Sequence, residues 1–190
     1  ESDEGPMTSS TDRNTEAMAG TPPARRSAWT TRQKCIRLLW GTFGRAAWWI
    51  PALRVPTLRM FGGRVGRGCN LPRKVELTIP WNITLGDRVF IGERAILYSL
   101  GPITVGSDVV IEVRAHLCAG SHDMRDTRFP LTRPPITIGD RCHIGIDAYI
   151  APDVELGEDC RVMHRASVYS SQPAGSTLAG NPAKPVEGGA

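Results

Sequence analysis

A histidine followed by an aspartate lies in a segment that breaks an otherwise regular apolar pattern. His122 and Asp123 fall within residues 120–135, which carry no repeat of their own. An unperturbed imidazole has a pKa of about 6.5, so it can take a proton from a hydroxyl group at neutral pH. The sequence therefore predicts that His122 can serve as a general base.

Metal binding and thiol catalysis fit the nearby residues less well. Cys118 with His122, and Cys160 with His164, have a Cys-x-x-x-His spacing that could suggest zinc. Cys160, however, occupies an inward position of the repeat described next, which commits its side chain to the core. Neither neighbour of Cys118 in the sequence is cationic, so nothing adjacent would lower the pKa of its thiol. We expect no metal and no thiol nucleophile.

The elements that must position His122 are indicated by a repeat of six residues. A larger aliphatic residue returns in thirteen hexads, with a smaller apolar residue two places before it. The larger set is Ile79, Leu85, Ile91, Leu97, Val105, Ile111, Leu117, Ile138, Ile144, Ile150, Leu156, Val162 and Val168. The smaller set is Leu77, Ile83, Val89, Ala95, Ile103, Val109, Ala115, Ile136, Cys142, Ala148, Val154, Cys160 and Ala166. A period of six fits neither an α-helix nor a lone strand, so it indicates a repeat architecture.

The two apolar positions of a hexad lie two residues apart, so on an extended segment both side chains point the same way. Glycine follows the larger residue in several hexads and suits the turn before the pattern restarts. Three hexads close a triangular coil. The pattern thus predicts an all-β fold, a parallel β-helix of about four to five coils, whose handedness does not follow from the period.

Two insertions interrupt the repeat. The step from Leu97 to Val105 is eight residues, and the step from Leu117 to Ile138 is twenty-one. Insertions in a solenoid leave as loops on one face, often the binding face, so we expect the chemistry in the loop over residues 120–135. His116 and His143 fall between the inward positions, and we expect them to lie on the surface.

The front half of the chain differs from the repeat in composition. The net charge of +4 conceals twelve basic and no acidic residues between positions 17 and 75. Residues 1–25 lack apolar periodicity and predict a disordered tail. Residues 26–60 form a basic amphipathic segment, and residues 61–190 the β-helix domain with a C-terminal tail over 172–190.

The basic segment contains one expected helix, between Gln33 and Ile50. Its apolar stripe is Ile36, Leu39, Trp40, Phe43, Ala47 and Ile50, at spacings of three and four. Such a helix could cap the open first coil, or lie against an anionic membrane surface as a peripheral contact. We do not expect nucleic-acid binding, because no binding motif accompanies the charge. No apolar run approaches the ~20 residues that cross a bilayer.

The cysteines favour a reducing compartment. The chain has five, an odd number, and no segment that reads as a secretory signal. Cys142 and Cys160 occupy inward positions and substitute for small apolar residues. We expect cytoplasmic localisation, with no disulfide framework.

Three sequence features together resemble the hexapeptide-repeat O-acetyltransferases, in particular the colanic-acid biosynthesis group. They are the repeat, the loop Leu117-Cys118-Ala119-Gly120-Ser121-His122-Asp123 and the tail Leu178-Ala179-Gly180-Asn181-Pro182-Ala183-Lys184. The stretches 60–66 and 80–87 fit the same group. The resemblance covers about residues 55–186.

The resemblance implies a left-handed β-helix that assembles as a homotrimer, with an active site in each groove between subunits. It implies acetyl-CoA as the cosubstrate, a sugar hydroxyl as the acceptor, and His122 as the general base. Asp123 is expected to orient the acceptor or the histidine, or else only to cap its own turn. The residues expected to bind the cofactor are Ile146, His164, Arg165, Gly180, Asn181, Pro182, Ala183 and Lys184.

The chain departs from the family pattern at three places. Met163-His164-Arg165 stands where Gly-Ala-Gly is usual, which would narrow the cofactor groove or add phosphate contacts through His164 and Arg165. Tyr98-Ser99 replaces an expected Asp-Asn near the acceptor, so Tyr98 and Ser99 become candidate acceptor-binding residues. Tyr169-Ser170 replaces a usual Thr-Lys.

We therefore expect an acetyl-CoA-dependent O-acetyltransferase that serves surface polysaccharide or glycolipid synthesis. Two alternatives remain open from the sequence. One is a non-catalytic β-helix scaffold that has lost CoA binding, and the other is a transferase of another acyl group or onto an amine.

Overall fold

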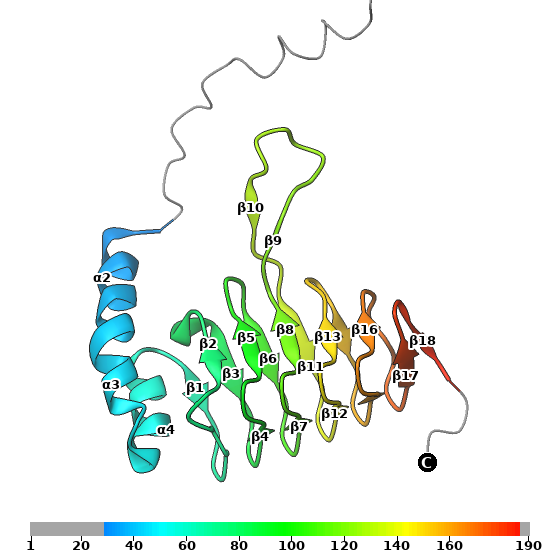
Figure 1. The fold of residues 1–190 in the computed structure, drawn as a ribbon, viewed down its shortest axis with the longest axis horizontal. Coiled ribbons are helices and arrows are strands. Elements are labelled where there is room, and N and C mark those ends of the chain that lie inside the picture. Colours follow the sequence, from blue (N-terminus) through cyan, green and yellow to red (C-terminus); the bar gives the residue numbers. More distant parts are fainter. Residues whose placement is uncertain (1–28, 187–190) are drawn as a thin grey trace, which may run out of the picture. The chain divides into compact units, whose positions relative to one another are not determined.

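Short strands wind into a parallel β-helix with three faces (Figure 1). The computed structural model describes residues 29–186, so the tail predicted over residues 1–25 lies outside the described residues. Sheet A contains β1 (Arg64–Val65), β3 (Ile83–Leu85), β6 (Ile103–Val105), β11 (Ile136–Ile138) and β14 (Glu155–Leu156). Sheet B contains β4 (Phe90–Ile91), β7 (Val110–Ile111), β12 (His143–Ile144), β15 (Arg161–Val162), β17 (Thr177–Gly180) and β18 (Ala183–Pro185). Sheet C contains β2 (Glu76–Leu77), β5 (Ile96–Tyr98), β8 (His116–Cys118), β13 (Tyr149–Ile150) and β16 (Ser167–Val168).

The core consists of the apolar positions of the repeat, stacked in register from coil to coil. Ile83 pairs with Ile103, which in turn pairs with Ile136. All thirteen larger residues are at most 3% exposed, and every smaller one except Leu77 is buried. Each buried Val, Leu or Ile side chain contributes roughly 1.5–3 kcal/mol by leaving water. The predicted core and the predicted period are confirmed.

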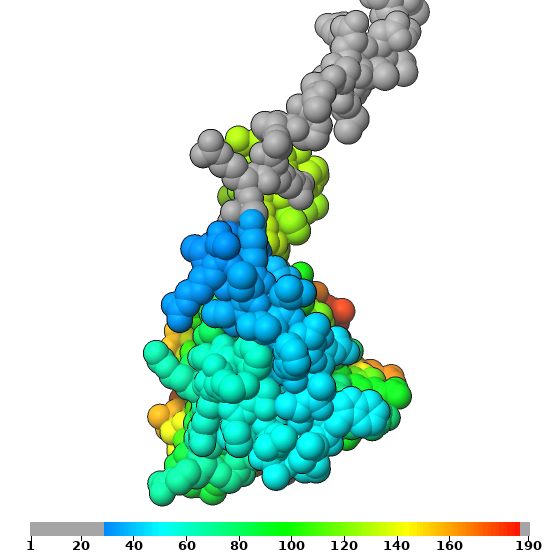
Figure 2. All heavy atoms as spheres, turned by 90° about the vertical axis from the view of Figure 1, so that its left-hand side faces the viewer, coloured from blue at the N-terminus to red at the C-terminus, as the bar shows by residue number. Residues whose placement is uncertain are grey.

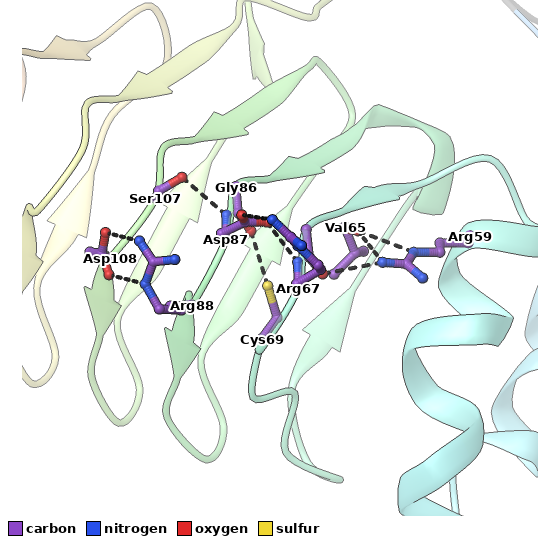
Figure 3. Close-up of polar contacts among 10 residues, drawn as sticks. Arg59, Val65, Arg67, Cys69, Gly86, Asp87, Arg88, Ser107 and Asp108 are labelled. Atoms are coloured by element: carbon purple, nitrogen blue, oxygen red, sulfur yellow. Dashed lines mark hydrogen bonds and ion pairs between the residues drawn. The ribbon is translucent and has the colours of Figure 1, made fainter.

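Polar contacts hold the corner between sheets A and B (Figure 3). The backbone N–H of Asp87 donates to Ser107 Oγ at 3.1 Å, and the N–H of Arg67 donates to Asp87 Oδ1 at 2.7 Å. Arg88 and Asp108 form a two-point ion pair with both N···O distances at 2.6 Å. These side chains are largely exposed, so each pair adds little stability alone. Because these contacts join each turn at this corner to the turn of the next coil, they help to set the register between coils.

Glycines at the same corner are required by the close stacking of adjacent coils. A Cβ atom at Gly86 would lie 2.6 Å from the carbonyl carbon of Gly106. One at Gly106 would lie 2.7 Å from the backbone nitrogen of Asp140. Backbone cannot yield as a flexible side chain can, so this column accepts no side chain without a shift of the coils.

Two buried cysteines replace small apolar residues of the core, in the positions predicted for them. The Cys142 thiol donates to the Gly157 carbonyl at 3.0 Å, and the Cys160 thiol donates to the Pro173 carbonyl at 3.1 Å. Burial raises the pKa of the Cys142 thiol to about 11. The thiol therefore stays protonated at neutral pH and links one coil to the next.

Helices cover the open first coil (Figure 1). They are α2 (Thr31–Leu39), the π-helical segment η1 (Trp40–Gly44), α3 (Arg45–Ala47) and α4 (Pro51–Met60). The sequence predicted one helix, and α4 was not expected. Trp40 and Trp48 are buried, and their indole N–H groups donate to backbone carbonyls of the first coil at 3.4 and 3.3 Å. In residues 29–186 no helix is both long and apolar enough to cross a membrane.

The buried face of these helices is rotated from the predicted apolar stripe. Trp40, Gly44 and Trp48 are buried, whereas Phe43 and Ile50 on the stripe are exposed. Gly44 explains the difference, because a Cβ atom there would lie 2.6 Å from the Trp40 ring. Trp40 and Trp48, with Gly44 between them, therefore pack against the first coil.

The long insertion forms a hairpin rather than an irregular loop. Its strands β9 (Ser121–His122) and β10 (Leu131–Thr132) pair antiparallel. The hairpin leaves the solenoid after β8 and returns before β11, and Figure 1 shows it projecting from the middle of the stack. A second hairpin, β17 with β18, ends the described chain on the last coil.

Candidate functional site

His122 lies on the exposed hairpin, opposite Leu131 in the β9–β10 ladder. The turn beyond this ladder is held by its own backbone. The N–H of Asp123 donates to the Pro130 carbonyl at 3.0 Å, and the N–H of Phe129 donates to the Asp126 carbonyl at 2.8 Å. The predicted location of the histidine, in the emergent insertion, is what the fold shows.

One hydrogen bond orients the His122 ring. Its Nδ1 atom lies 2.7 Å from the carbonyl oxygen of Phe129. A carbonyl can only accept, so in the neutral ring Nδ1 carries the proton and Nε2 keeps a lone pair. Phe129 adopts a φ of 46°, in the left-handed region, which directs its carbonyl into the hairpin. The arrangement leaves Nε2 as a proton acceptor on an exposed side chain.

Asp123 makes a local contact instead of reaching the histidine. Its Oδ1 atom accepts the backbone N–H of Arg125 at 2.9 Å, which is the turn-capping geometry of an Asx turn. Within residues 29–186 no hydrogen bond joins the Asp123 carboxylate to the His122 ring. The capping role, one of the alternatives from the sequence, accounts for the contact that the residue makes.

The two candidate acceptor residues have opposite environments. Ser99 is fully buried, and its Oγ atom accepts from the N–H of Ile79 and donates to the Ile79 carbonyl, at 2.9 and 3.0 Å. Its hydroxyl thus joins two coils and does not face a ligand. Tyr98 is 37% exposed, and a Cβ atom at Gly120 would lie 3.1 Å from its ring. Tyr98 therefore lies beside the base of the hairpin that carries His122.

A row of rings runs along the outer face of sheet C next to this base. His116 packs edge-on against Tyr98 and Tyr149, and Tyr149 contacts Tyr169. The His116 ring points outward as predicted but is half-buried between its neighbours. Burial lowers the pKa of His116. The pKa of Tyr149 is raised to about 12, mainly by burial and to a smaller extent by a hydrogen bond with Cys118. Sequence reasoning missed this row, because its members come from four different coils.

His164 and Arg165 lie on the turn between β15 and β16. Nδ1 of His164 accepts the backbone N–H of Ile146 at 2.9 Å, so a neutral His164 ring carries its proton on the exposed Nε2. The Ile146 carbonyl in turn accepts the N–H of Arg165 at 2.8 Å. Both backbone groups of Ile146 therefore make a hydrogen bond within the solenoid, and its carbonyl oxygen keeps one further lone pair. Arg165 is largely exposed, 4.0 Å from the Asp147 carboxylate.

The C-terminal hairpin places the tail motif on the last coil. Gly180 has a φ of 92°, and the chain reverses there so that β17 and β18 pair antiparallel. β18 then returns along β17 with Lys184 opposite Ala179, and the Lys184 side chain is exposed. An ammonium group in this place can meet an anionic group such as a phosphate.

These candidate residues fall on two different corners of the solenoid. His122 follows sheet C and precedes sheet A, whereas His164 and Arg165 lie between sheets B and C. In the described part of the chain, no hydrogen bond or ion pair connects the hairpin with the C-terminal residues. One copy thus presents a potential base and a potential anion-binding region separately.

No metal site emerges from the residues that the structure describes. Within 29–186, no group of three or more His, Cys, Asp or Glu side chains could hold a metal ion. His143 instead contacts Glu112, with Nε2 2.8 Å from Oε1. The site chemistry rests on the imidazole of His122, the surrounding rings and the cationic residues of the last coil.

Comparison with known proteins gives the fold and the sequence relationship. The bacterial transferase hexapeptide (six repeats) family matches residues 135–169, and the hexapeptide repeat of succinyl-transferase matches residues 82–112. The chain is 37% identical over 152 residues to the colanic acid biosynthesis acetyltransferase WcaF of Escherichia coli, covering 78% of this chain and 84% of that protein.

Solved structures agree with the predicted fold class. A hexapeptide-repeat acetyltransferase of Vibrio cholerae, solved with acetyl coenzyme A, aligns with a TM-score of 0.77 at 20% identity, covering 86% of this chain and 92% of that one. A maltose O-acetyltransferase of Clostridium difficile aligns with a TM-score of 0.76 at 20% identity, covering 83% and 88%. The predicted left-handed β-helix is confirmed at the level of the fold.

Proposed function

The chain belongs to the hexapeptide-repeat acetyltransferase family, and on this premise we propose that it transfers an acetyl group from acetyl-CoA to a hydroxyl of a sugar or surface-polysaccharide precursor. The relationship to a colanic acid biosynthesis acetyltransferase, which spans most of both chains, supports this acceptor class. The fold shared with a relative solved with acetyl coenzyme A agrees with the proposed donor.

The hydrogen bond between His122 and Phe129 carries the proposed mechanism. Nε2 of His122 takes the proton of the acceptor hydroxyl while the hydroxyl oxygen attacks the thioester carbonyl carbon. The carbon–sulfur bond then breaks, the thiolate of CoA leaves, and the imidazolium returns its proton to the sulfur. The products are an acetyl ester and CoA, without an acyl-enzyme.

The last coil and the tail supply the proposed donor site. Arg165, Lys184 and the Nε2–H of His164 are exposed donors suited to CoA phosphates. Gly180 to Ala183 would contact the donor along the tail hairpin. The N–H of Ile146 is engaged by His164, so Ile146 would offer the donor its side chain and the remaining lone pair of its carbonyl oxygen.

On the acceptor side, we assign the contact to Tyr98, which is 37% exposed and lies at the base of the hairpin. Asp123 would act by keeping the turn in shape, and Ser99 by fixing strand β5. Neither role requires a direct contact with the sugar.

We further propose that the site is completed between copies in a homotrimer. His122 and the cationic residues of the last coil leave the solenoid at different corners, so a second copy can bring one set against the other. The exposed hairpin β9–β10 is the element that would reach across (Figure 1).

The proposal is tested by measuring CoA release from acetyl-CoA across a panel of sugars and nucleotide sugars. The wild type should release CoA with at least one acceptor, and His122→Ala should lower the rate about 10²–10⁴-fold. His143→Gln, which removes a different, partly buried histidine that contacts Glu112, should keep the wild-type rate. Acetyl transfer by His122→Ala at the wild-type rate would contradict the assignment, and failure of the wild type to bind acetyl-CoA would favour the scaffold alternative.

A further inference from the structure

A pocket of about 720 Å³ lies between the helices and the first coil, and none of the proposed reaction residues lines it. Helix α3 contributes Arg45 to its wall, the turn after α3 contributes Trp48 and Trp49, and the first coil contributes Arg73 and Lys74. Figure 2 shows this end of the molecule, where the helices (blue to cyan) face the viewer. The volume is within the range of pockets that hold small-molecule groups.

The pocket is strongly cationic. Arg45, Arg73 and Lys74 line it, and within residues 29–186 none of them is paired with a carboxylate. Glu76 is the one acidic side chain on the wall. The Arg73 guanidinium lies 4.3 Å above the Trp49 ring, a cation–π contact that holds its charge at the opening. Arginine and lysine side chains placed in this way favour phosphate.

Exposed apolar side chains on α2, η1 and α4 and on the turn between α3 and α4 provide a second, independent observation. Leu38, Phe43 and Trp49 are each at least 67% exposed, and Ile50 and Met60 are 52% and 74% exposed. The core uses none of these side chains, because Trp40 and Trp48 take the contact with the first coil. Tryptophan and leucine or phenylalanine beside basic residues are typical of helices that lie in a membrane interface.

We propose that this end of the molecule binds an anionic lipid bilayer, with a lipid phosphate in the pocket and the exposed apolar side chains of the helices among the lipids. Charge complementarity favours this occupant, because residues 29–75 contain ten basic and no acidic residues. A second copy would bring an equally basic pocket against the first, which like-charge repulsion opposes. A small soluble phosphate would leave the apolar surface without a partner.

The test is co-sedimentation of the full chain with vesicles of phosphatidylcholine alone or mixed with phosphatidylglycerol. The wild type should bind the mixed vesicles and not the neutral ones. Arg73→Glu combined with Lys74→Glu should weaken binding at least ~30-fold, because each basic residue near an anionic surface is worth about 1 kcal/mol. Phe43→Ser combined with Ile50→Ser should also weaken it, and Arg161→Glu on sheet B should bind as the wild type does.

Two further arms separate the sources of phosphate. Inorganic phosphate and a short-chain phosphatidylglycerol, kept below its micelle concentration, are added as competitors at equal concentration, and the short-chain lipid should compete better. Circular dichroism and sedimentation velocity confirm that each variant keeps the fold and assembly of the wild type. Equal binding to neutral and anionic vesicles, or wild-type binding by the Arg73/Lys74 variant, would overturn the proposal. These results do not depend on the acetyl-transfer assay, so this proposal and the proposed function can fail separately.

Discussion

Nδ1 of His122 lies 2.7 Å from the carbonyl oxygen of Phe129, and this contact sets which nitrogen of the ring can accept a proton. The partner is a backbone group seven residues along the chain. Its direction depends on the φ of 46° at Phe129 and on the short β9–β10 ladder. The hairpin thus positions the imidazole ring of His122.

Substitution of Phe129 tests whether its carbonyl positions the His122 ring, without changing the histidine itself. Phe129→Pro should lower kcat markedly, toward the full ~10²–10⁴-fold contribution of a general base, because proline fixes φ near −65°, removes the N–H that bonds the Asp126 carbonyl, and moves the Phe129 carbonyl. Phe129→Gly should retain most of the activity, because glycine adopts positive φ readily. Steady-state kinetics with acetyl-CoA and the acceptor compares them. If both variants had the same kcat, the carbonyl would have no positioning role.

Removal of the cationic groups on the last coil should weaken the binding of acetyl-CoA and leave the chemical step little changed. We expect Arg165→Ala and Lys184→Ala each to raise the KM for acetyl-CoA several-fold, up to about tenfold, with kcat little changed, since each removes a charge-assisted hydrogen bond worth roughly 1.5 kcal/mol. Arg64→Ala, on the first coil, serves as the matched control. Unchanged KM values in both the Arg165→Ala and the Lys184→Ala variant would contradict the proposed donor site.

Mixing a variant impaired in chemistry with one impaired in donor binding tests the shared site. His122→Ala subunits and Arg165→Ala/Lys184→Ala subunits, unfolded together, refolded and assayed at acetyl-CoA well below KM, should exceed the mean activity of the two unmixed variants, because some interfaces then combine an intact hairpin with an intact last coil. Sedimentation equilibrium should show a trimer for each preparation. Activity of the mixed trimers equal to the mean of the two variants would mean that each site is built from a single copy.

Close stacking at the glycine column should be visible in stability. Gly86→Ala should lower the free energy of unfolding by about 1–3 kcal/mol, because its Cβ atom meets backbone of the next coil at 2.6 Å. Gly41→Ala, where nothing lies within 4 Å of the added atom, should not destabilise the protein. Urea unfolding at fixed protein concentration compares the two. Equal effects would contradict the packing argument.

The buried ring of His116 should make stability depend on pH. Burial holds the pKa of His116 below its ordinary value, so the unfolded chain takes up a proton that the folded chain does not. The contribution is present above the ordinary pKa of about 6.5 and is lost as pH falls below it. His116→Phe should therefore show a shallower loss of unfolding free energy between about pH 7.5 and pH 5.5. Equal slopes in the two proteins would contradict this.

Most of the fold could be predicted because the repeat is a local signal. Ile83, Ile103 and Ile136 form one buried column, and each is recognisable from its spacing to its own neighbours in the sequence. The insertion after Leu117 likewise indicated where His122 would emerge. The buried face of the N-terminal helices was harder to predict. Whether Phe43 or Trp48 is buried depends on how closely an indole can pack against Gly44.

The finer site could not be predicted, because it depends on contacts between coils and on backbone groups. Ser99 looked available in the sequence, yet both of its hydrogen bonds go to Ile79 one coil away. The backbone N–H and carbonyl of Ile146 form hydrogen bonds with His164 and Arg165. The Phe129 carbonyl has no sequence signal at all, since any residue at that position carries one.

The central claim is that His122 serves the chemistry and not the binding of the donor. The most direct measurement is calorimetric titration of acetyl-CoA into the wild type and His122→Ala, with the transfer rate measured on the same preparations. We predict similar dissociation constants for the two proteins and a rate lower by about 10²–10⁴-fold in the variant. Absence of acetyl-CoA binding by the wild type, or an unchanged rate in His122→Ala, would contradict the account.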